Sequence, residues 1–269
     1  MKYFLFVIVG MLVTNNCAAQ NNIKVIDSIL HRLYWADKLN GNILIAEKGQ
    51  VVYNKSFGLA NEITRQQLND CSVFELASLT KQFTAMAIMI LKEQKKLNLD
   101  ESIARYLPEL SFYHAITIRN LLNHTGGLPD YLKLMEHTWN KTRIATNQDV
   151  IDFFSKNQPK PLFEANTRFD YSNTGYVFLA SIIERCAGMP YPVFLKRNIF
   201  NPLDMLQTEV FRRRYAPHKV VNYAWGYEYV EKQKRYQLPD SLPQSQYVVW
   251  MDGVYGDGAV HSTVVDLLK

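Results

Sequence analysis

The chain has 269 residues, of which 48% are apolar and 20% are charged, and its formal net charge is +5. This length and composition are typical of a soluble globular protein with one large domain, or with a core domain and an inserted cap. The small positive excess argues against nucleic acid as a partner, and the short basic run 212–214 is expected to be a solvated loop.

Residues 1–19 have the pattern of a signal peptide. Lys2 supplies a positive start, an apolar stretch follows over 3–13, and Cys17-Ala18-Ala19 forms a small-residue cleavage site. The apolar stretch is too short to remain as a stable membrane anchor. We therefore expect an exported protein, periplasmic or secreted, with a mature domain over 20–269 and no transmembrane anchor after cleavage. A lipoprotein anchored through Cys17 is the less favoured alternative, because Thr14-Asn15-Asn16 is a poor approach to a lipidated cysteine.

Export would leave two cysteines, Cys71 and Cys186. They could pair in an oxidising compartment, but two buried free thiols are favoured, and Cys186 lies in an apolar helical run that suits a small core residue. The six histidines and three cysteines show no spacing that is typical of a metal site. We expect neither a metal nor a cofactor.

Helical spacing of apolar residues predicts a first helix over 23–38, which Asn40-Gly41 ends. A β-hairpin is predicted from Asn42 to Tyr53 with its turn at Lys48-Gly49. The next long helix, 78–94, is apolar nearly all round over 83–91, which predicts burial in the centre of the domain. Two short helices follow, capped by Asp100 and Thr117, and the second ends at His124. Two further helices are predicted over 173–187, closed by Gly188, and over 191–200. Residues 221–256 are expected to form strands or aromatic-rich loops, and Ser262 caps a final helix.

Ser78-Leu79-Thr80-Lys81 is a candidate nucleophile and base. Positions i and i+3 of a helix face the same way, so Lys81 is expected one turn from the Ser78 hydroxyl. The positive end of the helix dipole favours a developing oxyanion at Ser78 and, with burial, a neutral Lys81 that can take its proton. The alternative makes Ser78 a plain helix cap and Lys81 a solvated residue of the first turn.

Tyr171-Ser172-Asn173 lies between an extended segment and the next predicted helix. Such a turn can hold a phenol and a carboxamide in one cleft, where Tyr171 can shuttle a proton to a leaving group. Asn173 can hold Lys81 and hydrogen-bond a substrate amide. The alternative is an aromatic core residue followed by a helix cap at Ser172 or Asn173.

Five sequence blocks in the same order resemble the beta-lactamase-related serine hydrolases, namely class C beta-lactamases, D-alanyl-D-alanine carboxypeptidases and similar esterases. The resemblance implies an α/β (α+β) fold of the beta-lactamase/transpeptidase type, with an antiparallel sheet flanked by helices and a mainly helical region. It also implies that Ser78 is acylated, that Lys81 and Tyr171 are the acid/base pair, and that Asn173 contacts the substrate and Lys81. The blocks are residues 74–85, 116–131, 169–176, 199–205 and 258–269.

Two departures from the family pattern stand out. Gly126 replaces a serine that is frequent in the family. The family's Lys/His-x-Gly strand follows a helix that begins Ser-Thr-x-x-Asp-Leu, and this chain reaches Lys269 inside that helix, so we expect a C-terminal truncation with late sheet strands and one oxyanion-hole amide missing. The residues His124-Thr125-Gly126 fit the Lys/His-x-Gly pattern, but their position in the chain predicts a segment that ends a helix.

The leading hypothesis is an exported serine hydrolase that forms an acyl-enzyme on Ser78 with an amide, β-lactam or ester substrate. The substrate would be a small molecule or a peptide, including one derived from the cell wall. Two alternatives remain open: a non-catalytic, penicillin-binding-like binding or sensor protein, and an inactive truncated fragment. The aromatic residues Tyr223, Trp225, Tyr227 and Trp250 either line a substrate cleft or pack in the core, and the latter is expected for at least half of them.

Overall fold

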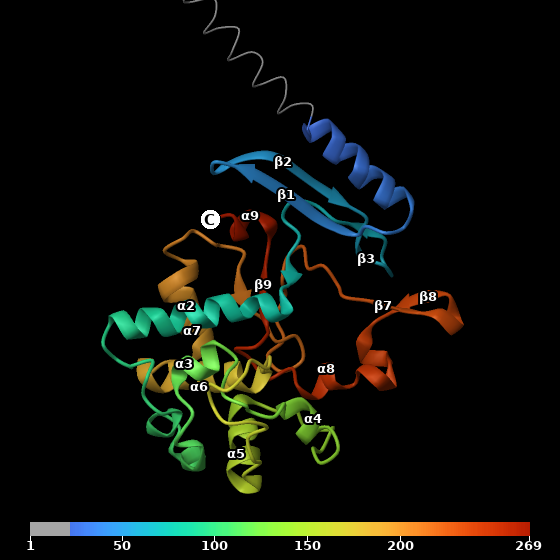
Figure 1. The fold of residues 1–269 in the computed structure, drawn as a ribbon. Helices are drawn as coiled ribbons and strands as arrows, with labels where there is room; N and C mark the ends of the chain where they lie inside the picture. Colours follow the sequence, from blue (N-terminus) through green and yellow to red (C-terminus); the bar gives the residue numbers. More distant parts are fainter. Residues whose placement is uncertain (1–21) are drawn as a thin grey trace, which may run out of the picture.

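The structure is a computed structural model that describes residues 22–269 (Figure 1). The predicted signal peptide and Cys17 lie outside the described residues. A helix covers residues 22–35, three residues shorter at its end than predicted, and the predicted hairpin is confirmed as strands β1, Gly41–Glu47, and β2, Gln50–Phe57. The two strands pair antiparallel from Gly41–Phe57 to Glu47–Gln50. The intervening turn therefore lies at Lys48-Gly49, as expected.

The helix over 22–35 packs on this hairpin, at the top of the molecule in Figure 1. The Asp27 carboxylate accepts hydrogen bonds from the Tyr53 hydroxyl at 2.8 Å and from Lys55 Nζ at 2.7 Å, both on β2. The rings of His31 and Tyr34 contact Phe57 with centroid separations of 5.3 and 5.8 Å. Polar contacts thus fix one end of the interface and aromatic packing fixes the other.

The main core forms where helix α2, Thr80–Glu93, packs on helix α6, Asn173–Ala187. Every residue of α6 from Thr174 to Ile183 is buried, because other helices cover its remaining faces. The predicted bounds of α6 are confirmed, and so is its end at Gly188, which has a φ of 65° that favours glycine. Helices α3, Ile118–Leu122, and α7, Tyr191–Leu195, also pack on α6.

The prediction that α2 is buried nearly all round is wrong for one face. Phe83, Ala87 and Ile88 are buried against the core, whereas Met86 and Met89 are 53% and 38% exposed. The reason is that α6 and its neighbours pack on one side of α2 and leave the methionine side partly exposed.

The short helices around this core confirm one predicted cap and correct another. Thr117 caps α3 in a capping box with Asn120, as expected, but the cap of the preceding 3-10 helix is Ser102 rather than Asp100, which instead forms an ion pair with Arg119. The other helices are η2 Ile103–Arg105, η3 Pro108–Tyr113, α4 Tyr131–Met135, α5 Asn147–Asn157, η4 Lys196–Phe200, which continues α7 as a π-helix, η5 Glu231–Gln233, η6 Pro239–Ser241, η7 Pro243–Ser245, α8 Tyr247–Trp250 and α9 Val264–Leu267.

All pairs between the named strands are antiparallel, as predicted, but the described residues hold four small sheets rather than one. The sheet that positions the site has the strand order β5 (Phe74–Glu75), β9 (Val260–Ser262), β6 (Glu209–Val210). Ser262 lies in β9, and Thr263 caps the final helix through the Asp266 amide, which corrects the predicted cap by one residue. The remaining strands are β3 Leu59–Asn61, β4 Gln66–Gln67, β5 Phe74–Glu75, β6 Glu209–Val210, β7 Glu228–Val230, β8 Arg235–Gln237 and β9 Val260–Ser262.

Cys71 and Cys186 are both free and half-buried, and burial raises the pKa of the Cys186 thiol. Over residues 22–269, none of the helices combines the length and the apolar character that a membrane crossing requires.

Candidate active site

Ser78 lies in a 3-10 turn, η1, Ala77–Leu79, that leads directly into α2. Its side chain is exposed and makes no capping bond to either helix; instead Ser78 Oγ lies 3.2 Å from Lys81 Nζ. Lys81 is only 6% exposed. This geometry is incompatible with a plain helix cap and a solvated lysine.

The Lys81 ammonium lies between three segments that are far apart in the sequence. Besides Ser78 Oγ, Nζ contacts Asn173 Oδ1 at 2.9 Å, at the start of α6, and the backbone carbonyl of Asp257 at 2.9 Å. A protonated lysine has three N–H donors and no acceptor, so these three contacts use its full hydrogen-bonding capacity. Burial of the charge is thereby compensated on all sides.

The segment that carries the Asp257 carbonyl is held directly against α2. Thr84 Oγ1 donates to the Gly256 carbonyl at 2.7 Å, and Thr80 Oγ1 accepts from the Val260 amide at 3.0 Å. The Leu76 amide donates to the Val260 carbonyl at 2.9 Å, next to the pairing of β5 with β9. These three hydrogen bonds therefore fix the backbone that presents the Asp257 carbonyl to Lys81.

The orientation of Asn173 follows from its two amide contacts. Nδ2 faces the carboxylate of Asp130 at 3.4 Å, which leaves Oδ1 to face Lys81. Ser172, not Asn173, caps α6, because its hydroxyl accepts the Gly175 amide at 3.2 Å. One of the two cap positions considered from the sequence is therefore correct, and the Asn173 amide remains available to the site.

Tyr171 is less closely attached than the other predicted site residues. It is 48% exposed, so it is not a core residue, and Lys81 Nζ lies 4.9 Å from the centre of its ring. Across residues 22–269 no hydrogen bond joins its hydroxyl to Ser78 or Lys81. The structure thus brings Ser78, Lys81 and Asn173 together through hydrogen bonds and places Tyr171 beside them through its ring.

Two contributors were missed by the sequence analysis. Helix α3 ends at Leu122 rather than at His124 as predicted, and the His124 ring stacks on Tyr171 with centroids 4.5 Å apart and an angle of 29°. Asp257 contributes a backbone carbonyl, which leaves no mark in a sequence, and its side chain accepts from Tyr131 Oη at 3.2 Å. Burial raises the pKa of the Asp257 carboxyl. The sequence motif around His124 could have singled out this residue, but a motif contains no information on the distance between His124 and Tyr171.

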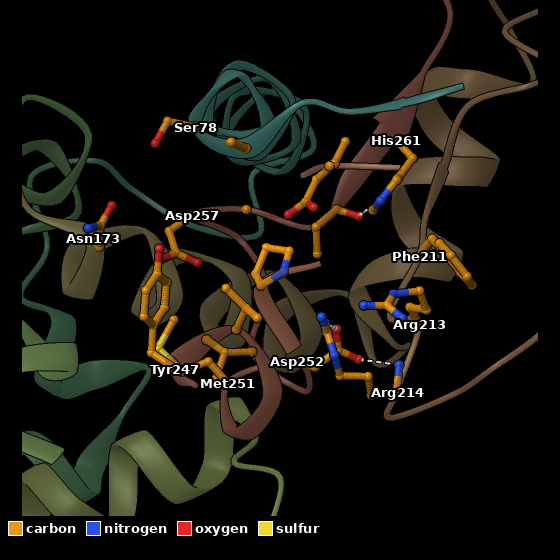
Figure 2. Close-up of a pocket in the computed structure, with 18 of the residues that line it drawn as sticks. Ser78, Asn173, Phe211, Arg213, Arg214, Tyr247, Met251, Asp252, Asp257 and His261 are labelled. Atoms are coloured by element: carbon orange, nitrogen blue, oxygen red, sulfur yellow. Dashed lines mark hydrogen bonds and ion pairs between the residues drawn. The ribbon is translucent and has the colours of Figure 1, made fainter. Parts of the chain in front are cut away.

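A cavity of about 360 Å³ opens beside Ser78, within the size range of small-molecule sites. Figure 2 shows Ser78, Asn173 and Asp257 on one side and Arg213, Arg214 and Asp252 on another. The basic run is therefore not the solvated loop that was predicted. Arg214 is paired with Asp240 at 2.7 Å and with Asp252 at 2.9 Å, and its side chain is only 19% exposed.

Of the four aromatic residues considered from the sequence, two line this cavity, one lines another depression and one packs in the core. Tyr223 and Trp225 line this cavity, and the guanidinium of Arg213 lies 4.9 Å from the Trp225 ring. Tyr227 lines a separate depression on the surface, and its hydroxyl donates to Asn61 at 3.0 Å. Trp250 is a core residue, 1% exposed.

Comparisons with known proteins agree with the fold. The Beta-lactamase family profile matches residues 34–269. Penicillin-binding protein 4* of Bacillus subtilis (strain 168) is 42% identical over 250 residues, which cover 93% of this chain and 55% of the relative. The D-amino acid amidase of Ochrobactrum anthropi SV3, solved with L-phenylalanine, has 27% identity and a TM-score of 0.73 over 91% of this chain and 69% of its own. A class C beta lactamase shares the fold, with 24% identity and a TM-score of 0.70 over 93% of this chain and 64% of its own.

The chain spans about half the length of the curated relatives it matches, 55% and 53% for two proteins of Bacillus subtilis. Within that span the family profile covers both segments that meet at Lys81, the start of α2 and the start of α6. The chain therefore belongs to the Beta-lactamase family of serine hydrolases and has the beta-lactamase/transpeptidase fold.

Proposed function

We propose that this protein is an exported serine hydrolase that forms an acyl-enzyme on Ser78. The observation that carries the proposal is the buried Lys81 Nζ, 3.2 Å from Ser78 Oγ and 2.9 Å from both Asn173 Oδ1 and the Asp257 carbonyl. A lysine inserted between a serine hydroxyl and two fixed acceptors is arranged to exchange a proton with that serine.

The direction of proton transfer follows from what each neighbour of Lys81 can do. The Asn173 amide oxygen and the Asp257 carbonyl only accept hydrogen bonds. Once Lys81 has given up one proton, its two remaining N–H groups stay directed to these acceptors and its lone pair faces the Ser78 hydroxyl. Ser78 Oγ attacks the substrate carbonyl carbon while its proton passes to Lys81, and the positive end of α2 stabilises the oxyanion.

We assign Tyr171 the delivery of a proton to the leaving group. Its ring lies against Lys81, with Nζ 4.9 Å from the ring centre, and its side chain is 48% exposed. Collapse of the tetrahedral intermediate breaks the bond to the leaving group, which takes the Tyr171 proton, and leaves an ester on Ser78. Lys81 passes the proton that it took from Ser78 to Tyr171, which restores the phenol. Water then hydrolyses this ester. Asn173 holds Lys81 and is placed to bind a substrate amide.

The proposed substrate is a carbonyl compound of the amide, β-lactam or ester class, including a peptide derived from the cell wall. The 42% identity to a penicillin-binding protein and the 27% identity to a D-amino acid amidase support an amide or a β-lactam. Export is part of the proposal because residues 1–19 have the composition of a signal peptide.

Covalent labelling tests this function. The full chain is incubated with a fluorescent penicillin and, separately, with a fluorophosphonate, and the labelled peptide is identified by mass spectrometry. We expect the label on Ser78 and none in the Ser78→Ala variant, because the attacking oxygen is gone. The control Ser28→Ala, at an exposed position on the first helix, should label like the wild type. Undiminished labelling of Ser78→Ala would contradict the proposal.

A further inference from the structure

His124 occupies a rigidly held position beside the site. It follows α3 in a left-handed conformation with a φ of 57°, which few residues other than glycine and asparagine adopt readily. Its amide donates to the Leu121 carbonyl at 3.3 Å and its carbonyl accepts from the Asp170 amide at 2.9 Å. The backbone of His124 is thus tied to the residue that directly precedes Tyr171.

The imidazole ring contacts both the Tyr171 ring and the backbone amide that follows Tyr171. It stacks on the Tyr171 ring at 4.5 Å, and its Nδ1 accepts the amide of Ser172, the next residue, at 3.0 Å. On its other sides it packs against Tyr176 at 5.1 Å and edge-on against Phe169 at 5.7 Å. One side chain therefore holds both the ring of Tyr171 and the peptide bond that follows it.

The hydrogen bond to Ser172 requires a particular form of the ring. Nδ1 accepts only when it carries no proton, so the ring is neutral with its hydrogen on Nε2. Burial and the neighbouring Lys81 ammonium lower the pKa of His124 below 6.5, which keeps the acceptor form in place at neutral pH. The titratable groups around the ring are Lys81, Tyr171 and Tyr176.

We propose that His124 is a positioning residue that fixes the Tyr171 phenol for proton delivery, an inference that rests on the function proposed above. No hydrogen bond joins the described His124 ring to Ser78 or Lys81, so His124 acts through Tyr171 rather than on the reacting atoms. Tyr171 is half-exposed and no described hydrogen bond joins its hydroxyl to Ser78 or Lys81, so its ring is held by contacts with His124 at 4.5 Å and with Lys81 at 4.9 Å. A reacting group displaced by about 1 Å can cost roughly 100-fold in rate.

The test is the rate of Ser78 acylation by a fluorescent penicillin, with the inhibition constant KI and the maximal rate kinact measured separately. We expect His124→Ala to lower kinact by about 10- to 100-fold with little change in KI. His124→Asn keeps an acceptor near Nδ1 and tolerates the left-handed backbone, so it should lose only the ring stack and fall between His124→Ala and the wild type. The control His114→Ala, at an exposed histidine, should leave both constants unchanged.

A double-mutant cycle with Tyr171→Phe separates positioning from a purely structural role. Phenylalanine keeps the ring but removes the hydroxyl, so the loss caused by His124→Asn should largely disappear in the Tyr171→Phe background. Additive losses, or wild-type kinact in both His124 variants, would overturn the inference. Circular dichroism shows whether each variant folds. If His124→Ala does not fold, the double-mutant cycle is measured with His124→Asn alone. If Ser78→Ala still labels, the proposed function fails instead, and the two failures are distinguishable.

Discussion

Ala77 has a left-handed backbone with a φ of 44°, directly before the proposed nucleophile. Such a conformation costs a residue with a Cβ about 1–2 kcal/mol and persists only where the surroundings impose it. Here the pairing of β5 with β9 holds the chain before Ala77, and the bond from the Leu79 amide to the Leu76 carbonyl, 3.0 Å, closes the turn around it. Ser78 directly follows this strained residue, with Oγ 3.2 Å from Lys81 Nζ.

Replacing Ala77 with glycine should therefore stabilise the protein. Ala77→Gly relieves the strained φ, and we expect the free energy of unfolding in urea to rise by about 1 kcal/mol. The matched control Ala85→Gly lies in the middle of α2, where glycine has no strain to relieve, and should lower stability by about 1 kcal/mol. Equal losses in both variants would show that Ala77 is not strained.

At the scale of elements, the site depends on how closely the segment before β9 approaches α6. Gly256 has a φ of 104°, and a Cβ at this position would lie 2.5 Å from the carbonyl oxygen of Tyr176 and 2.5 Å from Ala180 Cβ. Only a residue without a side chain allows the segment to pass between α2 and α6. The next residue then presents its carbonyl to Lys81.

We expect Gly256→Ala to lower the free energy of unfolding by about 3 kcal/mol, because the clash involves helix backbone and the φ favours glycine. The Asp257 carbonyl should also move away from Lys81, so penicillin labelling of Ser78 should slow. Urea unfolding and labelling rates measure the two effects. Gly41→Ala is the control, since nothing lies within 4 Å of its added Cβ. Wild-type stability and labelling in Gly256→Ala would disprove the packing argument.

At the scale of the whole molecule, the half-buried His124 and the buried His261 link stability to pH. Burial lowers the pKa of both His124, beside Tyr171, and His261, in β9, below 6.5, while Glu75, Glu209 and Asp252 near His261 partly oppose the shift. Unfolded histidines take up protons near pH 6.5, before the folded ones do. The stabilising contribution is therefore complete above about pH 6.5 and is lost as the pH falls toward the folded pKa values.

The free energy of unfolding should accordingly fall between pH 7 and pH 5. Urea unfolding across this range measures the slope, and His261→Asn should flatten it by up to about 1.4 kcal/mol per pH unit, because one titrating group is removed. His114→Gln, at an exposed position, is the control and should leave the slope unchanged. An unaltered slope in His261→Asn would exclude a contribution from this histidine.

The sequence predicted much of the local structure because the signals act within a few residues. The turn at Lys48-Gly49, the helix cap at Thr117 and the helix end at Gly188 depend on φ values and short-range bonds, and all three are confirmed. The predictions at Asp100 and Ser262 failed by one or two residues, since the neighbouring Ser102 and Thr263 also have hydroxyls that can cap.

By itself the sequence determined the family and which residues are candidates for chemistry, because Ser78 and Lys81 share one helical face whatever the rest of the chain does. Only the tertiary structure decided what meets them. The Asp257 carbonyl lies 176 positions from Lys81 in the sequence, and the contact exists because Gly256 fits between two helices. Likewise the ring of His124 reaches Tyr171 because two chain segments are bonded side by side. Such contacts depend on packing between segments that are far apart in the sequence. A local sequence pattern does not specify the spatial distance between those segments.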